Sequence, residues 1–541
     1  MIFELPVISD AERTPLVEAL LTILDCQQLH IQQLTETVQN LRDEIALLKG
    51  QKPRPIIAPS PLEKTPKAPL KPGDKRPGSD KRAKNASFPA PIEVTIPFPD
   101  PPAGSVSRGF EEYFVQELVI EAKVTRYLRE RIRTPDGQTL LAPLPNEVIP
   151  GSHFGPTLTG FVLNQYHQCN VTQPLLLEQL HELGIDISAG QIDRLLTENR
   201  ELFHEEKAAI LPAALEESSY IGVDDTGARH EGHNGFCTAL GNDLFAYFES
   251  TDSKSRVNFL QVLRGASTAY TINDTSLIYW DHQKLAVAVV ERLCLGTRHF
   301  ATELDWQARL AELEITSERH VRIATEGALL GQLSAQGVSP NLVILSDGAP
   351  QFDLFLHASC WIHIERPLQR VVPYSEAHRT AIEAVRKLIW DLYQELKAYR
   401  LKPEPTRKEE LTKKFAELVN QKSDYPASIG AVLKEMGSQK ASLLRVLDHP
   451  QVPLHNNGME SDIRGYVKTR KISGSTRSTA GRRCRDTFAS LKKTCRKLGV
   501  SFWHYLQDRL RGLGKIPQLA ALIRQRAQES PTVQPAEAVP A

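Results

Sequence analysis

The chain has 541 residues, 41% of them hydrophobic, which is long enough for three or four domains with substantial cores. Its formal net charge of zero, from 65 basic and 65 acidic residues, hides an uneven distribution of charge along the chain. No apolar run reaches the roughly 18 residues of a membrane-spanning helix, and the N-terminus lacks the basic start and apolar core of a secretory signal. The seven cysteines are scattered and form no C-x-x-C pair. This argues against a disulfide framework or a cysteine zinc site, so we expect a cytoplasmic protein.

The first segment, residues 1–50, carries a sustained heptad pattern between residues 15 and 49. A β-branched residue or leucine at position a and leucine at position d favour a parallel two-stranded coiled coil. We therefore expect a homodimer or higher oligomer formed through residues 15–49, the alternative being an amphipathic helix packed on its own domain. The a positions are Val17, Leu24, Ile31, Val38 and Ile45, and the d positions are Leu20, Leu34, Leu41 and Leu48, with Gln27 interrupting the d series.

Two segments without a large core are expected next. Residues 51–107 are rich in proline and lysine, which is typical of a linker. Between residues 108 and 150, apolar and polar residues alternate with the period of a β-strand in FVQELVIEAKVTRYLRERIRT. Pro135-Asp136-Gly137 supplies a turn, so we expect a small β unit.

Residues 151–215 have a helical pattern. TQPLLLEQLHELG predicts an amphipathic helix that ends at Gly184, and SAGQIDRLLTENRELF predicts a second helix with Ser188 as its N-cap. A helix, a short turn and a helix are compatible with a DNA-binding helix-turn-helix motif and equally with an ordinary helical hairpin.

A run of strands begins near residue 219, in which GFCTALG and DLFAYFEST follow the first strand. SYIGVDDTGAR is an apolar strand that reaches Asp224, and NLVILSDGAPQF is another that reaches Asp347. Downstream, HNNGMESDIRGYVKTRK predicts a helix that carries Glu460 in its first turn, with Asn456 or Asn457 as its cap. Two strand aspartates and a helix glutamate on a mixed sheet with flanking helices indicate an α/β domain of the ribonuclease-H-like fold.

Three such acids suit metal-dependent phosphodiester cleavage, in which two divalent ions about 3.5–4 Å apart activate the nucleophile and relieve charge on the leaving oxygen. Mg²⁺ (or Mn²⁺) prefers carboxylate oxygens, and we expect Asp224 to bridge two ions while Asp347 and Glu460 each complete one. Asp225 and Asp462 are competing acids. Asp462 is two residues from Glu460 and faces elsewhere on the helix, whereas Arg464 at i+4 shares its face.

A basic run from Arg464 to Arg511, rich in arginine, glycine, serine and threonine, predicts contact with DNA phosphates. The alternative is a solvated basic surface. The residues that we expect to bind DNA are Arg464, Lys468, Arg470, Lys471, Arg477, Arg482 and Arg483.

These motifs resemble transposases of the insertion sequence 66 family, also called the TnpC type. The resemblance runs from the leucine-zipper-like N-terminus through VIPGSHFGPTLTGFVLNQYHQCNVTQPLLLEQLHELGIDIS, VDDTG, SDGAPQF and CWIHIER to NNGMESDIRGYVKTRKISGS and the basic tail. It implies a DDE transposase whose catalytic, metal-binding acids are Asp224, Asp347 and Glu460. It implies double-stranded DNA as partner, at element ends and target, and accessory proteins from the same element. Supporting roles are expected for Asp225, His363, Asn456 and Asn457, and a packing role for Trp361.

The chain departs from the family pattern in places. The β unit at 108–150 has none of the cysteines of the family's zinc module, so no zinc is expected, and Asp225 stands where the family often has glutamate. A third departure is an extra segment at about 268–340, between the first and second acids, whose function the sequence does not indicate. The resemblance implies a catalytic domain at 216–515 with a helical insertion at about 365–450. Residues 516–541 are expected to form a disordered tail.

The function predicted from these observations is cleavage of element ends and transfer of the 3′-hydroxyl to target DNA. Two alternatives remain open at this point. One is a metal-dependent nuclease of the same fold, which cuts without joining. The other is a DNA-binding regulator with an inactive catalytic fold.

Overall fold

The structure is a computed structural model that describes residues 14–24, 26–27, 30–31, 34, 38, 92–145, 148, 151–371, 373, 375–423 and 425–529. None of the helices in these ranges combines the length and the apolar character that crossing a bilayer requires.

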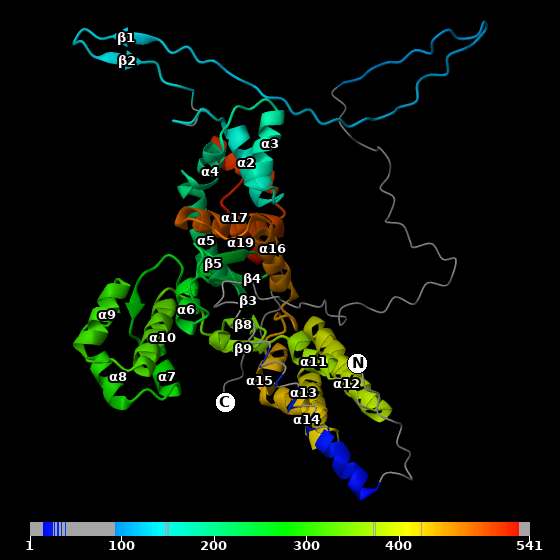
Figure 1. Ribbon diagram of the computed structural model, residues 1–541, viewed down its shortest axis with the longest axis vertical. Helices are drawn as coiled ribbons and strands as arrows, with labels where there is room; N and C mark the ends of the chain where they lie inside the picture. Colours follow the sequence, from blue (N-terminus) through cyan, green and yellow to red (C-terminus); the bar gives the residue numbers. More distant parts are fainter. Residues whose placement is uncertain are drawn as a thin grey trace.

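The centre of the molecule is a five-stranded mixed sheet in the order β5-β4-β3-β8-β9 (Figure 1). Strand β4 is antiparallel to β3 and β5, whereas β3, β8 and β9 are parallel. The expected α/β class is therefore confirmed. The strands are β3 (Tyr220–Gly227), β4 (Phe236–Gly241), β5 (Ala246–Thr251), β8 (Val343–Ser346) and β9 (Leu356–Ser359).

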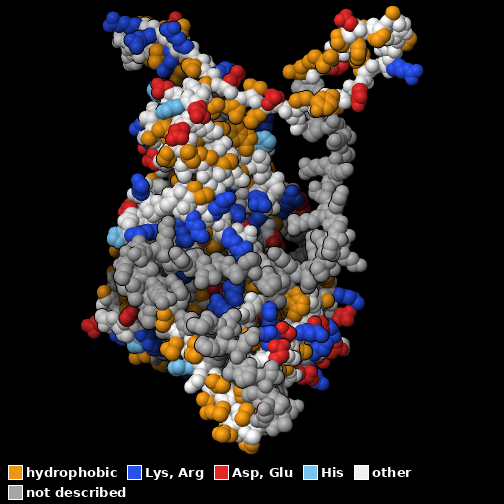
Figure 2. Space-filling model, turned by 45° about the vertical axis from the view of Figure 1, so that its right-hand side comes forward, with side chains coloured by type: hydrophobic (Ala, Val, Ile, Leu, Met, Phe, Trp, Pro, Cys, Tyr) orange, Lys and Arg blue, Asp and Glu red, His pale blue; other side chains and the backbone are white. Residues whose placement is uncertain are grey.

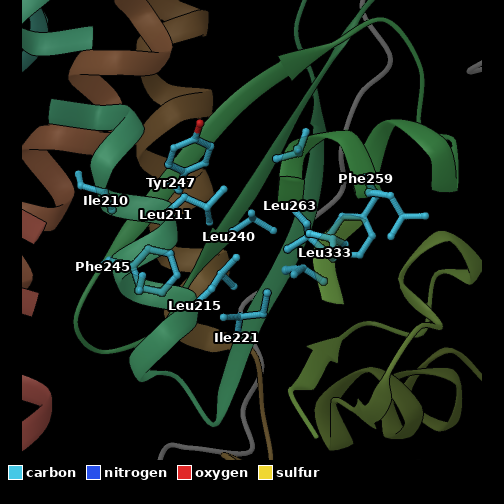
Figure 3. Packing of buried hydrophobic residues seen from close by; sticks show 14 of the residues in the cluster. Ile210, Leu211, Leu215, Ile221, Leu240, Phe245, Tyr247, Phe259, Leu263 and Leu333 are labelled. Carbon is cyan, nitrogen blue, oxygen red and sulfur yellow. The ribbon is translucent and has the colours of Figure 1, made fainter. Parts of the chain in front are cut away.

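One face of the sheet packs against helices α5 (Glu201–Glu217), α6 (Arg256–Arg264) and α10 (Glu318–Ala335). Figure 3 shows leucine and isoleucine side chains of α5 meeting those of β3 and β4, with α6 and α10 closing the cluster on the other side. The opposite face packs against α16 (Asn457–Ser473), whose Met459, Ile463 and Tyr466 join Ala239 and Phe248 in a second cluster. Each face is thus covered, as an α/β sheet requires.

Helix α17 (Thr479–Lys497) covers the free edge of the sheet at β5. Three side chains one helical turn apart accept hydrogen bonds from alternate backbone N–H groups of β5, which satisfies donors that an edge strand otherwise exposes. The accepting and donating pairs are Asp486 with Ser250 at 2.8 Å, Ser490 with Phe248 at 2.9 Å and Thr494 with Ala246 at 3.2 Å.

The N-terminal helical region packs on the C-terminal helices. It consists of α2 (Pro156–His167), α3 (Gln173–Glu182) and α4 (Ala189–Thr197), and α2 lies beside α18 (Phe502–Arg511). The N-cap prediction at Ser188 is confirmed, because its side chain accepts from the Gln191 N–H in a capping box. The predicted continuation of this helix is wrong, since the chain turns at Asn199 with φ +57° and α5 follows.

Two insertions flank the parallel strands (Figure 1). The first, between β5 and β8, adds a lobe beside α10 in which Trp280 and Trp306 are fully buried. The second follows β9 and has its own apolar core. The first insertion holds β6 (Tyr270–Thr271), α7 (Asp274–His282), α8 (Val287–Cys294), β7 (His299–Phe300) and α9 (Glu303–Glu312). The second holds α11 (Trp361–Arg370), α12 (Glu376–Leu401), α13 (Pro405–Asn420), η4 (Gln421–Ser423), α14 (Ala427–Ser438), α15 (Lys440–Leu443) and η5 (Arg445–Leu447).

Two segments outside the central sheet, residues 108–150 and the C-terminal segment, differ from the prediction. The predicted β unit is reduced to a hairpin of β1 (Arg131–Arg133) and β2 (Thr139–Leu141), because the alternating side chains before it are exposed and have no sheet to pack on. A tail that starts at residue 516 is wrong as well, since α19 (Leu519–Glu529) packs on α5 with Leu519 and Ile523 buried. The linker from 51 to 91 and most of the heptad segment lie outside the described residues.

Candidate active site

The two strand-borne aspartates lie beside each other at the centre of the sheet. Strands β3 and β8 are parallel, with Tyr220 opposite Val343 and Gly222 opposite Leu345. Continuing this register by two residues sets Asp224 against Asp347, which directly follows β8. Because side chains alternate along a strand, Gly222 and Asp224 share one face of the sheet. This face is the one that α16 covers.

Asp225 points to the opposite face of the sheet, where its carboxylate already accepts two hydrogen bonds. Its carboxylate accepts hydrogen bonds from the Thr238 hydroxyl at 2.6 Å and the Gln351 amide at 3.1 Å. Gln351 belongs to a short 3₁₀ helix, η3 (Pro350–Phe352), just behind Asp347. Asp225 therefore ties the strand β3 to the loop that carries Asp347. Neither Thr238 nor Gln351 stood out in the sequence, because a hydrogen bond between distant polar residues leaves no spacing pattern.

Asp224 lies in a strongly acidic, partly buried environment. Burial raises its pKa to about 7, and repulsion from Asp347, Asp225 and Glu460 acts in the same direction. The Asp225 N–H donates to Asp224 Oδ1 at 2.8 Å and opposes part of this rise. Mutual repulsion among neighbouring carboxylates is what a bound cation relieves.

The third acid comes from α16, which is anchored on β3 through Asn456. Asn456 is buried, and its amide Nδ2 donates to the Val223 carbonyl at 2.8 Å. A Cβ atom at Gly222 would lie 2.5 Å from Asn456 Oδ1, so the missing side chain of Gly222 lets the helix approach. Asn456 does occupy the N-cap position of α16, but its side chain makes no capping bond, so the predicted capping role is wrong. Asn457 is the first residue of the helix.

Glu460 lies in the first turn of α16, as predicted, and its side chain is 14% exposed. Arg464 approaches its Oε2 atom at 3.1 Å, and His363 Nε2 lies 3.8 Å from Oε1. Oε1 is buried and has no hydrogen-bond partner in the described structure. Burying a carboxylate oxygen without a hydrogen-bond partner costs free energy, and a bound cation would relieve this cost. Oε1 is therefore available as a metal ligand.

His363 reaches Glu460 from α11, whose first residue Trp361 has the expected packing role. Trp361 is buried in the core of the second insertion and donates to the Leu443 carbonyl at 2.9 Å. Burial and the nearby Arg366 lower the pKa of His363, which Glu460 and Asp347 oppose. The preceding Cys360 is also buried and accepts from the Asn456 N–H at 3.4 Å. This bond joins the starts of α11 and α16.

The described side chains do not form a ready-made metal cluster. No group of three or more His, Cys, Asp or Glu residues within the described ranges has the geometry to hold an ion as it stands. Asp347 is exposed to solvent, whereas Asp224 and Glu460 are partly buried.

The basic residues predicted to bind DNA fall into separate groups. Arg464, Lys468 and Lys471 are exposed on α16, and Arg477 and Arg483 are exposed beyond it. Arg470 turns inward, where it donates to the Thr226 hydroxyl at 3.4 Å and burial lowers its pKa. Arg482 forms an ion pair with Asp252 at 3.3 Å. The sequence could not separate these groups, because helix orientation decides which side chains face solvent.

Comparison with known proteins identifies the class of this molecule. The model of the transposase IS66 family matches residues 349–483, from behind Asp347 through the second insertion to α16 and the start of α17. The chain is 39% identical over 322 residues to the uncharacterized protein y4jO of Sinorhizobium fredii (strain NBRC 101917 / NGR234), across 59% of this chain and 100% of that relative.

The molecule therefore belongs to the transposases, a class of DNA-processing enzymes, by its similarity to this family. Within that class, the chain belongs to the IS66 family, as its motifs predicted.

Proposed function

We propose that the chain cuts DNA at the ends of its element and joins the freed 3′-hydroxyl to target DNA, with Asp224, Asp347 and Glu460 as the catalytic acids. We further propose that the sheet and its helices form a ribonuclease-H-like domain. Two observations support that fold: β3 is central, and the parallel strands β8 and β9 lie on the side opposite the antiparallel pair β4 and β5.

The observation that carries the proposal is the convergence of three acids from separate elements. Asp224 and Asp347 meet through the β3–β8 register, and Glu460 is brought to the same face by the Asn456 anchor. Burial, and after it repulsion from the neighbouring carboxylates, raises the pKa of Asp224. Arg464 pairs with the Oε2 atom of Glu460, but the buried Oε1 atom has no hydrogen-bond partner among the described residues, which leaves it able to bind a cation.

The donor set fits Mg²⁺ or Mn²⁺. Both ions prefer oxygen ligands, and Mg²⁺ is commonly held by one or two carboxylates with waters and substrate phosphate, so a preformed cage is not required. When bound, two such ions would supply an activated water and charge relief on the leaving oxygen. The chain's own contribution is to bring these carboxylates together, and bound cations would favour the ionised form of Asp224 in spite of its raised pKa.

The neighbours of Glu460 set its orientation. Arg464 holds Oε2 from the same helix, so Oε1 is the atom that remains turned toward the site. His363 lies on the side of Oε1 and limits its rotation. Asp225 holds the Asp347 loop in place through Gln351 and is expected to support the site from behind without binding an ion.

Metal-dependent nicking of a labelled duplex that carries the element's own end tests this function. The native chain is compared with Asp224→Asn, Asp347→Asn and Glu460→Gln, and we expect each substitution to reduce Mg²⁺-dependent 3′ nicking by at least about 100-fold while DNA binding survives. Asp353→Asn is the matched control, because it makes the same change at an exposed acid six residues beyond Asp347 and should keep most activity.

The same assay separates the alternatives. Joining of the 3′ end to a second unlabelled duplex distinguishes a transposase from a nuclease. A native chain that binds the end, never nicks it and is unaffected by the three substitutions would instead be a DNA-binding regulator.

A further inference from the structure

The first insertion is connected to the loop after Asp347 by a chain of hydrogen bonds. In the lobe, the Tyr279 hydroxyl on α7 donates to Glu326 Oε2 on α10 at 2.7 Å. The same hydroxyl accepts from Arg256 Nη1, at the start of α6, at 3.1 Å. The other amino group of this guanidinium, Nη2, donates to the Pro350 carbonyl at 2.6 Å. Arg256 therefore joins the lobe to the segment that follows Asp347.

The short helix η3 packs on α6 beside this contact. Phe352 of η3 is buried, and its ring lies 5.0 Å from that of Phe259 on α6 in an edge-on arrangement. Pro350 is three residues after Asp347, whose Oδ1 atom accepts from the Ala349 N–H at 3.2 Å. A shift of Pro350 would therefore move the backbone that sets the direction of the Asp347 side chain.

The stability of α6 does not explain an arginine at this position. Arg256 is the first residue of the helix, where the partial positive charge of the free N–H groups disfavours a cation. Ser255 already caps the helix by accepting from the Asn258 N–H. The hydrogen bonds to Tyr279 and Pro350 are therefore what the Arg256 guanidinium contributes.

Arg256 also differs from the basic residues of the surface. Figure 2 shows Lys and Arg side chains gathered on the surface across the middle of the molecule. Arg256 is half-buried, and its Nε atom is buried without a hydrogen-bond partner among the described residues. At the other end of the chain of hydrogen bonds, Glu326 is buried and lies 3.4 Å from Arg322. Because a cation and a carboxylate are linked through one tyrosine hydroxyl, both of its hydrogen bonds are charge-assisted and strong.

We propose that the first insertion positions the metal-binding loop of the active site, with Arg256 and Tyr279 as positioning residues. The lobe fixes the Tyr279 hydroxyl, which together with Glu326 orients the Arg256 guanidinium. The guanidinium then holds the Pro350 carbonyl and, through it, the backbone that carries Asp347. This gives a role to a segment whose function the sequence does not indicate. The inference rests on the proposed function, in which Asp347 is one of the acids that bind the ions.

Hydrogen exchange of the loop tests the positioning without metal or DNA. The Phe352 N–H donates to the Ala349 carbonyl at 3.0 Å and is protected while the loop keeps its shape. Arg256→Met removes the donors with little change in side-chain length, and Tyr279→Phe removes the hydroxyl alone. The segment 347–355 should exchange about tenfold faster in Arg256→Met and about threefold faster in Tyr279→Phe, because hydrogen bonds to charged groups are lost.

Thr325→Val is the matched control in the same lobe. Thr325 is next to Glu326 on α10 and accepts from Trp306 Nε1 at 2.9 Å, so this substitution removes a buried hydrogen bond without touching the link to the loop. The segment 347–355 should then exchange at the native rate. Native rates in both Arg256→Met and Tyr279→Phe would overturn the inference. Equal acceleration in Thr325→Val would overturn it too, since the stability of the lobe alone would then govern the loop.

Metal affinity separates a positioning role from a merely structural one. Residues that orient metal ligands commonly change metal affinity by about 10- to 100-fold. Mn²⁺ binding to the full chain is measured by electron paramagnetic resonance, and the difference from Asp347→Asn defines the signal of the site. Arg256→Met should weaken this binding about tenfold. Arg256→Lys should recover part of the loss, because an ammonium still reaches one of the two acceptors. Thr325→Val should bind Mn²⁺ as the native chain does.

The two measurements distinguish failure of this inference from failure of the proposed function. Native Mn²⁺ affinity in Arg256→Met would overturn the positioning role and leave the proposed function intact. Mn²⁺ binding that Asp347→Asn does not change would contradict the proposed function instead. The exchange rates of segment 347–355 would then still decide whether the lobe holds the loop.

Discussion

At the scale of single residues, the choice between Asp224 and Asp225 shows what a sequence leaves open. Both acids follow the same apolar strand, and either satisfies the motif. The β3–β8 register separates them, because adjacent side chains of a strand face opposite sides and only Asp224 faces α16. The strand and its acidic end were predictable from the apolar run. The side of the sheet toward which each aspartate points relative to α16 was not predictable, because it depends on which helix packs on which side.

The raised pKa of Asp224 predicts a pH-dependent stability of the metal-free protein. The pKa of Asp224 is about 7 in the folded protein and about 3.8 in the unfolded chain. As the pH rises, the carboxyl group of Asp224 therefore loses its proton at a lower pH in the unfolded chain than in the folded protein. The folded state then binds more protons than the unfolded state between these values, so stability falls with rising pH and the full penalty is present above pH 7. The substitution Asp224→Asn removes the ionisable group, so the variant does not lose folding stability in this way as the pH rises.

Thermal unfolding in a chelator at pH 5 and pH 8 measures the effect. The advantage of Asp224→Asn over the native chain should grow between these pH values by about 2–3 kcal/mol, and added Mg²⁺ should narrow it by stabilising the native site. An advantage that stays the same at both pH values would show that folding does not raise the pKa of Asp224.

At the scale of elements, the strands and helices with a regular hydrophobic pattern were predicted correctly, whereas short or irregular elements were not. Strands β3, β4, β5 and β8 were predicted because apolar residues dominate them. Strand β9 was missed, since its sequence LHAS has no strand pattern and only its parallel pairing with β8 defines it. Helix α19 was missed because the proline-containing end of the chain obscured an apolar face that packs on α5.

A buried ion pair holds this C-terminal region on α5. Glu206 accepts from Arg509 at 2.8 and 2.9 Å, from the Tyr505 hydroxyl at 2.8 Å and from the Leu519 N–H at 3.1 Å. Glu206 and Arg509 are almost completely buried. Without the Glu206 charge, the buried Arg509 keeps Asp508 as an ion-pair partner but loses its hydrogen bonds to a carboxylate on α5. A buried charge that loses part of its compensation costs more than the pair itself is stabilising.

We therefore predict that Glu206→Gln lowers the free energy of unfolding by about 3–5 kcal/mol. Glu216→Gln is a matched control, because Glu216 lies on the same helix and pairs with Arg524 at 3.0 Å, but at the surface. It should cost less than about 1 kcal/mol. Urea unfolding followed by circular dichroism measures both variants, and equal losses would mean that the Glu206 cluster is not a significant anchor.

At the scale of the whole molecule, the acids depend on segments that lie far apart in sequence. The two insertions separate β5 from β8 and β9 from α16, yet the sheet order and the Asn456 anchor bring the three acids together. The sequence predicted both insertions, but not that the second forms a core of its own or that Trp361 and His363 link this core to Glu460. Transposition joins two DNA ends, so a single copy of this site is expected to act with a second copy.

The N-terminal heptad is the segment that could supply this pairing. Its described part is helical, and Leu20 and Leu24 are 50% and 39% exposed in the single chain. Exposed leucines at heptad positions lose contact with water when two helices associate, at a gain of about 25 cal/mol for each Å² of apolar surface. We predict that the native chain is a dimer or larger in sedimentation-velocity experiments, whereas the double variant Leu20→Asp and Leu24→Asp is monomeric. Thr22→Asp introduces the same residue outside the a and d positions and should leave the oligomer intact. A native chain that already sediments as a monomer would contradict the coiled coil, and pairing of two active sites would then have to come from the DNA ends themselves.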